Sequence, residues 1–118
     1  MADAYTKVKY RDRIDIESGT FVPDTGTETI VGCTATLFDA SGAVVAAMDE
    51  VPVTSFTPGP QTAPYAIEGF SPVGLGLHEP TFQTGQDVYS LDFEAVDDRT
   101  PPGHYVSTQC IIVKPRGS

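Results

Sequence analysis

The sequence predicts an all-β fold: a two-sheet antiparallel sandwich of seven or eight short strands, in one domain that covers residues 1–118. The first observation is the alternation of apolar and polar residues from Tyr89 to Ala95, which is typical of a half-buried strand. The second is the short interval between clusters of Gly, Pro, Asp and Ser, which separate one strand from the next. The third is that no segment free of Pro and Gly shows the i, i+3, i+4 apolar spacing of a helix of normal length.

The N-terminal third predicts two strand regions and a hairpin turn. Residues 6–17 alternate apolar residues with charges except at positions 11–13, so we expect one strand, or two strands with a bulge between them. Residues 28–39 form the strongest strand outside the C-terminal third. Residues 39–42 follow as a hairpin turn, with Gly42 placed to adopt a positive φ.

The middle of the chain predicts three short strands and a long loop. We expect a return strand at residues 43–48, a strand at residues 51–56 with Pro52 favouring a sheet edge, and a strand at residues 65–70. Residues 71–86 are the longest irregular stretch. That loop carries four apolar residues, which are Val73, Leu75, Leu77 and Phe82. Long loops in compact domains are usually functional, so we expect this one to dock against a neighbouring subunit. The alternative is a lid over an open end of the sandwich.

The C-terminal third contains the two clearest strands. Residues 87–96 alternate as described, and residues 104–114 are rich in β-branched residues. The segment 97–103 between them holds two aspartates, two prolines and a glycine, which neither a helix nor a strand can pass through.

The charge is unevenly distributed. The formal net charge is −9, and no Lys or Arg occurs between Ile14 and Asp98. The basic residues are Lys7, Lys9, Arg11 and Arg13 near the start, and Arg99, Lys114 and Arg116 near the end. Nucleic acid binding needs a basic face, which the body of the chain lacks. The ordinary interpretation of the acidic middle is a solvated surface that aids solubility.

The four N-terminal basic residues lie on one face if their segment is extended, opposite Val8 and Tyr10. Such a row repels itself unless acidic groups lie across from it. One arrangement is internal, with the row crossing Asp92 and Glu94. The other is intermolecular, with this strand lying along the acidic surface of the next subunit. We favour the second, because little chain follows Val113 for a last strand and an open sheet edge needs cover.

No pattern in the sequence predicts catalysis, a cofactor or a membrane span. Phosphate-binding glycine loops, zinc-protease motifs and nucleophile elbows are all missing, and the two histidines adjoin turn residues. No apolar run approaches the roughly 20 residues of a transmembrane helix, and the N-terminus lacks the apolar core of a signal peptide. We therefore expect a non-enzymatic protein that is made in the cytoplasm. Asp97 and Asp98, with Asp92, Glu94 or Asp24 nearby, offer oxygen ligands for Ca²⁺, although adjacent turn aspartates are more often a turn feature.

Both cysteines, Cys33 and Cys110, fall within predicted strands among apolar neighbours. There a cysteine usually serves as a small core residue rather than as a nucleophile. Without a signal peptide the reducing cytoplasm disfavours a disulfide, so we expect two free thiols.

The end of the sequence resembles an immunoglobulin-like domain. The residues that carry the resemblance are the segment 89–93, Asp98, and Gly103-His104-Tyr105 before a strand that contains a cysteine. The resemblance implies that the Tyr105 hydroxyl bonds back to the loop before it. The sequence departs from the family: Cys110 lies five residues after Tyr105 rather than two, no tryptophan is present, and little chain follows Val113.

A small acidic domain of this kind, without a signal peptide, resembles the accessory structural proteins of tailed bacteriophages, such as neck pieces, tail adaptors and decoration proteins. The hairpin at residues 36–45 and the segment 101–108 carry this second resemblance. It implies a non-enzymatic subunit of the virion, assembled in the host cytoplasm, that binds copies of itself and other virion proteins. The implied contacts are the basic N-terminal residues and the loop at residues 71–86. The alternative is a bacterial surface adhesin or a carbohydrate-binding sandwich.

Overall fold

The computed structural model describes residues 5–19, 21, 24–53, 65–81, 83, 85 and 87–115. The all-β prediction is confirmed: these residues form seven strands and one short 3-10 helix. The strands are β1 (Tyr5–Lys9), β2 (Ile14–Glu17), β3 (Ile30–Phe38), β4 (Val51–Pro52), β5 (Ala66–Phe70), β6 (Asp87–Asp97) and β7 (His104–Lys114), and the helix is η1 (Ala46–Met48). The immunoglobulin-like assignment within this class stays a prediction.

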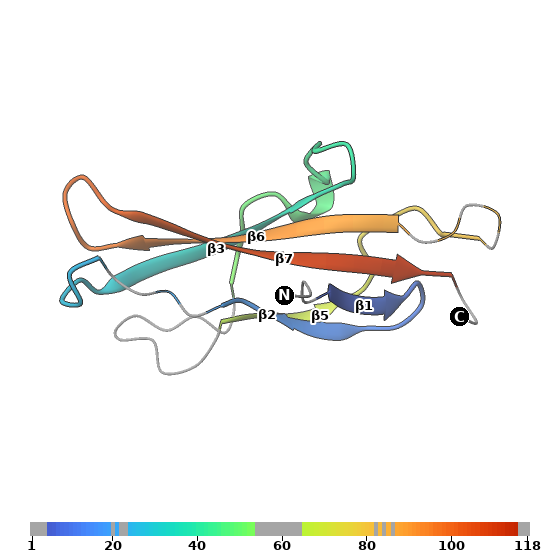
Figure 1. Cartoon of the computed structure of the whole chain (residues 1–118), viewed down its shortest axis with the longest axis horizontal. Coiled ribbons are helices and arrows are strands. Elements are labelled where there is room, and N and C mark those ends of the chain that lie inside the picture. Colours follow the sequence, from blue (N-terminus) through green and yellow to red (C-terminus); the bar gives the residue numbers. More distant parts are fainter. Residues whose placement is uncertain are drawn as a thin grey trace.

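The strands form two sheets that lie one above the other (Figure 1). The large sheet has the order β1-β7-β6-β3-β4, and the small sheet pairs β2 with β5. All neighbouring strands are antiparallel except β1 and β7, which are parallel. The antiparallel arrangement that the sequence predicted therefore holds for every pair except this one. Since the first strand lies beside the last one, its direction is not set by a hairpin.

The alternation along β6 sets the two faces of the large sheet. Its buried residues point to the small sheet and are Tyr89, Leu91, Phe93, Ala95 and Asp97. In the register of the sheet, Leu37 of β3 pairs with Leu91 and Ile111 of β7 pairs with Tyr89. Ile16 and Phe70 of the small sheet belong to the same core. The residues between them in sequence point the other way. We call that opposite side the outer face of the large sheet.

Residues 6–17 form two strands in different sheets, so the prediction of one strand, or of two strands joined by a bulge, needs correction. β1 ends at Lys9, the Asp12 amide donates to the Lys9 carbonyl at 3.0 Å, and β2 begins at Ile14. Val8 and Ile16 are both buried in the same core, but they reach it from opposite sheets. A turn is needed between them because one straight strand cannot contribute to both layers.

The hairpin at residues 39–42 is present, but the return strand predicted at residues 43–48 is wrong. The Asp39 amide donates to the Ala43 carbonyl at 2.9 Å, and Gly42 has a φ of 87°. Strand pairing then continues only as a single bridge between Phe38 and Val44 before η1 begins. The turn of η1 places Met48 in the core.

The strand predicted at residues 51–56 is β4, which is shorter, since Val53 follows it outside any strand and residues 54–56 lie outside the described part of the chain. β4 is an edge strand, as Pro52 predicted.

The long molecule measures 50 × 30 × 23 Å. Within the described residues, no helix has the length and hydropathy needed to cross a membrane.

The expectation of an open sheet edge beside the C-terminal strand is also wrong. β7 is itself the last strand, and β1 of the same chain covers its free side from Tyr5↔Cys110 to Lys9↔Lys114. The open edge that favoured an intermolecular position for the N-terminal strand is therefore covered within one chain.

Candidate functional site

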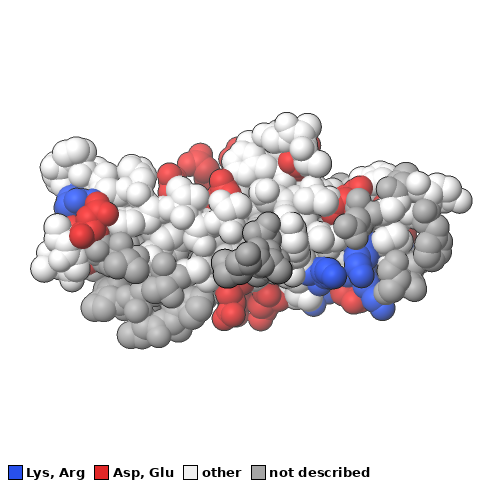
Figure 2. All heavy atoms as spheres, viewed as in Figure 1, with Lys and Arg blue, Asp and Glu red and all other residues white. Residues whose placement is uncertain are grey.

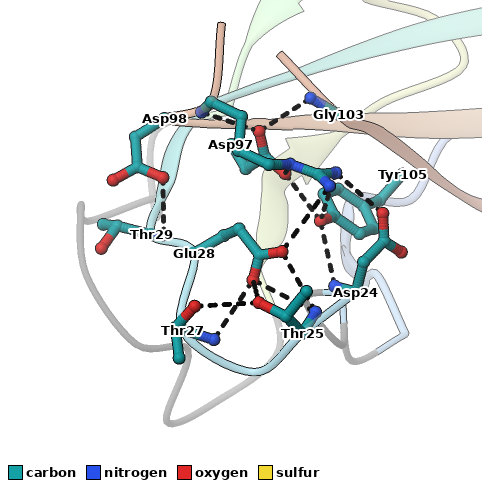
Figure 3. Close-up of polar contacts among 10 residues, drawn as sticks. Asp24, Thr25, Thr27, Glu28, Thr29, Asp97, Asp98, Gly103 and Tyr105 are labelled. Carbon is teal, nitrogen blue, oxygen red and sulfur yellow. Dashed lines mark hydrogen bonds and ion pairs between the residues drawn. The ribbon is translucent and has the colours of Figure 1, made fainter. Parts of the chain in front are cut away.

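The turn between β6 and β7 is fixed by one buried carboxylate (Figure 3). Asp97 is 2 % exposed, and its two oxygens accept four hydrogen bonds. The donors are the Arg99 amide at 3.0 Å, the Arg99 Nε at 2.8 Å, the Gly103 amide at 2.7 Å and the Tyr105 hydroxyl at 2.8 Å. Asp97, the last residue of β6, is thus bonded to Arg99 near the start of the turn and to Gly103 at its end.

Arg99 and Tyr105 extend this cluster to the segment that precedes β3. The Arg99 Nη2 donates to Asp24 Oδ2 at 2.7 Å, and its Nη1 lies 3.7 Å from the Glu28 carboxylate. The Asp24 amide donates to the Tyr105 hydroxyl at 3.3 Å. The Tyr105 hydroxyl thus bonds back to the start of the preceding turn, as the resemblance implies, although it bonds a side chain there.

Gly103 leaves space that the cluster occupies. A Cβ atom on it would overlap the Arg99 guanidinium and lie 2.6 Å from the Asp97 Oδ2. The guanidinium therefore passes directly over the glycine on its way to Asp24. Gly103 and Tyr105, which the sequence singled out as structural residues, lie in one cluster.

The electrostatics of the cluster favour the charged form of Asp97. Loss of solvent opposes ionisation, but the hydrogen bonds from Gly103, Tyr105 and Arg99 outweigh it and lower the pKa of Asp97 to about 2. The pKa of Arg99 is raised by its hydrogen bond to Asp24, although desolvation acts in the opposite direction. The cluster is an ion network that locks one end of the sandwich.

The Ca²⁺ site considered at Asp97 and Asp98 does not fit this geometry. Both oxygens of Asp97 already accept bonds from protein donors, and Asp98 Oδ1 accepts a bond from the Thr29 amide at 3.1 Å. Asp24, the third candidate ligand, is paired with Arg99. Within the described residues, no group of three or more His, Cys, Asp or Glu side chains is placed to hold a metal ion.

The four N-terminal basic residues do not form one row, which corrects the sequence prediction. Lys7 and Lys9 are exposed on β1, whereas Arg11 and Arg13 come after the strand has ended. The Arg13 guanidinium lies over Gly69 of β5, because a Cβ there would be 2.6 Å from its Nη2. Basic atoms are gathered near β1 (Figure 2). Among the residues that the structure describes, no carboxylate lies within ion-pair distance of any of the four.

The internal arrangement, with the basic row against Asp92 and Glu94, is also wrong. Both acidic residues lie on β6, and β7 separates that strand from β1. Asp92 accepts a hydrogen bond from the Thr108 hydroxyl at 2.8 Å, and Glu94 lies 3.5 Å from the His104 ring. The two carboxylates are therefore satisfied by β7, which leaves the β1 lysines without them.

The outer face of the large sheet was not predicted as a site. By register it carries Lys7 and Lys9 from β1, Val106 and Thr108 from β7, Val88, Ser90, Asp92 and Glu94 from β6, and Thr34, Thr36 and Phe38 from β3. Val106 is 59 % exposed and Val88 is 39 % exposed. The face combines exposed valines with separated basic and acidic groups. The signal in the sequence was Val88 and Val106 at positions where the alternation calls for polar residues.

A groove lies on this face beside the hairpin at residues 39–42. It has a volume of about 480 Å³, with Phe38 and Val88 supplying apolar walls and Asp39 and Asp92 supplying acidic ones. Asp39 is held in place because its carboxylate accepts bonds from the Ser41 hydroxyl at 2.6 Å and the Ala43 amide at 3.0 Å. The Ser41 hydroxyl and the Ala43 amide lower the pKa of Asp39, so the groove stays acidic.

The loop at residues 71–86 belongs in part to the core, which corrects the interface prediction for Leu77. Leu77 is 7 % exposed and lies in the core cluster, while Leu75 is partly buried against it. Val73 is 44 % exposed. Phe82 lies outside the described residues. The described part of the loop therefore favours the lid alternative. The loop has no strand pairing there, and its leucines pack against the core instead.

Cys33 and Cys110 are free thiols on different strands of the same sheet. The register pairs Cys33 with Ala95 and Cys110 with Ser90, so β6 lies between the two cysteines. Two strand spacings amount to about 10 Å, which exceeds the reach of a disulfide. Burial raises the pKa of the Cys33 thiol to about 11, which disfavours the reactive thiolate form in the folded protein.

Comparisons with protein-family models, with curated proteins and with solved structures found no match to this chain.

Proposed function

We propose that this chain is a non-enzymatic structural subunit that acts through protein–protein contacts. The observation that supports the proposal is the outer face of the large sheet. This face exposes Val88 and Val106 at separate positions, together with charged groups that are arranged by sign: lysines on β1 and carboxylates on β6. Specific interfaces combine apolar contact with complementary charge in this way.

The setting we propose is the particle of a tailed bacteriophage, as a neck, tail-adaptor or decoration subunit. The support is the sequence resemblance alone, at the hairpin of residues 36–45 and the segment 101–108. In that setting the partners are copies of this chain and other virion proteins, and the subunit is assembled in the host cytoplasm.

The test is the mass of the purified protein in solution, followed by electron microscopy of phage particles decorated with an antibody against this chain. We expect a mass above that of the 12.6 kDa monomer, and labelling at one position on the particle. A strict monomer that binds an oligosaccharide and labels no particle would overturn the proposal in favour of the carbohydrate-binding alternative.

A further inference from the structure

We infer that a cavity beside the small sheet binds the C-terminal residue of another protein chain, with its carboxylate on Arg13 and its apolar side chain against the core. The cavity lies where β5, the turn after β5 and η1 meet, and its volume is about 340 Å³. The inference deepens the proposed function, on which it rests for the choice of a protein chain as the occupant.

A β-bulge in the small sheet shapes one wall of the cavity. β2 and β5 lie side by side (Figure 1), and their register leaves Asp15 of β2 opposite two residues of β5, Glu68 and Gly69. Gly69 has a φ of 70°, and its amide donates to the Asp15 carboxylate at 2.9 Å. Glycine adopts this φ without strain, and a bulge of this kind redirects the side chains beside it. Both bulge residues line the cavity.

Arg13 supplies the positive charge of the cavity. Its guanidinium lies over Gly69, since a Cβ on that glycine would be 2.6 Å from Nη2 and 3.5 Å from Cζ. The glycine that forms the bulge therefore also leaves room for the arginine. In the described part of the chain no carboxylate lies within ion-pair distance of Arg13. The planar guanidinium can thus bind a carboxylate from outside through two parallel hydrogen bonds.

The inner part of the cavity is apolar. Met48 of η1 and Ile67 and Phe70 of β5 are core residues, and Leu75 of the following turn is partly buried against the same core. An aliphatic side chain that enters the cavity therefore moves from water into apolar contact, which is favourable. The volume is at the small end of the range for ligand sites, so the occupant is about one residue in size.

The turn after β5 forms a fixed wall of the cavity. The Ser71 hydroxyl accepts a bond from the Gly74 amide at 3.0 Å, and the Ser71 carbonyl accepts one from the Leu75 amide at 2.9 Å. Gly74 packs so closely that a Cβ there would be 3.2 Å from the Ser71 hydroxyl oxygen. Because its own hydrogen bonds hold this wall in place, binding does not have to order it, which lowers the entropic cost.

The charge and the apolar wall together favour the end of a chain over an internal segment. An internal Asp or Glu brings a carboxylate without an apolar side chain, and an internal leucine brings the reverse. A C-terminal leucine carries both groups on one α-carbon, and capture of a terminal carboxylate is a known mode of peptide recognition. Glu68 also lines the cavity, where its carboxylate can accept the peptide N–H of that residue and disfavours a second negative charge.

The experiment is a titration of the protein with an N-acetylated tripeptide, Ala-Ala-Leu, followed by amide NMR. The free acid is compared with its C-terminal amide, because the two differ only in the charge that Arg13 binds. We expect the free acid to shift the amide signals of Gly69, Gly74 and Leu75, and not that of Gly103 in the β6–β7 turn. It should bind roughly tenfold or more tightly than the amide, since charge-assisted hydrogen bonds are the stronger ones.

Arg13→Gln should bind the free acid and the amide equally, and Arg13→Lys should retain part of the preference, because it keeps the charge without the planar fork. Arg11→Gln is the matched control, since it removes the same charge from an exposed side chain outside the lining of the cavity. It should keep the wild-type preference. Circular dichroism should show the wild-type fold for all three variants.

A tripeptide that ends in serine should bind more weakly than the one that ends in leucine, because it leaves the apolar walls uncovered. The last probe is 4-methylpentanoate, which has the carboxylate and the branched chain of leucine without the peptide group. We expect it to bind more weakly than the tripeptide. Equal binding would make the occupant a free acid and overturn the choice of a chain end.

Three other outcomes overturn the inference: no shift with either peptide at millimolar concentration, equal binding of acid and amide by the wild type, or loss of the preference in Arg11→Gln as well as in Arg13→Gln. If the peptides fail to bind while the protein assembles and labels phage particles, the proposed function stands without this site. If the free acid binds as expected but no particle is labelled, the site stands and the virion setting fails.

Discussion

The stability that Asp97 contributes depends on pH. Asp97 is buried, yet its pKa is lowered to about 2 from the ordinary value of 3.8. A carboxyl whose pKa is lower in the folded state stabilises the fold fully above its unfolded pKa and loses that contribution as the pH falls through the folded value. Asp97 therefore stabilises the fold above about pH 4, and this contribution disappears between about pH 4 and pH 2.

We predict that Asp97→Asn lowers the free energy of unfolding at pH 6 and that its difference from the wild type shrinks as the pH falls from 4 to 2. Urea unfolding followed by circular dichroism measures both. A difference that is constant over this range would contradict the assignment.

In Tyr105→Phe, which removes one donor to Asp97, the pKa of Asp97 measured by carboxyl NMR should be higher than in the wild type.

The sequence indicated part of this cluster. Gly103 and Tyr105 were recognisable because a Gly-x-Tyr segment follows a turn. The role of Asp97 was not, since two adjacent aspartates in a turn look alike and only burial distinguishes them. Arg99 was equally hidden, because its partners Asp24 and Glu28 lie about 70 residues earlier in the chain.

At the level of elements, alternation predicted the strands that are paired on both sides. β3, β6 and β7 appear with bounds within two residues of those expected. The predictions failed at edges and connections. Residues 6–17 alternate as one strand would, because Val8 and Ile16 share a core, but nothing local reveals that they approach it from opposite sheets. The prediction for residues 43–48 failed because pairing stops at the Val44 bridge and the chain then turns into η1.

The loop at residues 71–86 provides a test at this scale. Leu77 is buried and Val73 is exposed, although the sequence gives them similar surroundings. We predict that Leu77→Ala lowers the free energy of unfolding of the monomer by about 2–5 kcal/mol through a cavity, and that Val73→Ala changes it by less than about 0.5 kcal/mol. Chemical denaturation of both variants measures this. Equal and small effects would restore the docking interpretation for Leu77.

The whole molecule brings its two free thiols into different environments. Cys33 points to the core and its pKa is raised to about 11, whereas Cys110 is half-buried on the outer face, paired with Tyr5 and Ser90 in the register. Only the thiolate reacts with alkylating reagents. In the folded monomer Cys110 should therefore react with iodoacetamide faster than Cys33, and both should react once urea unfolds the chain.

Mass spectrometry of the alkylated peptides measures the two rates separately. Equal rates for Cys33 and Cys110 in the folded protein would contradict this difference in environment, because a buried thiol with a raised pKa forms little of the thiolate that reacts.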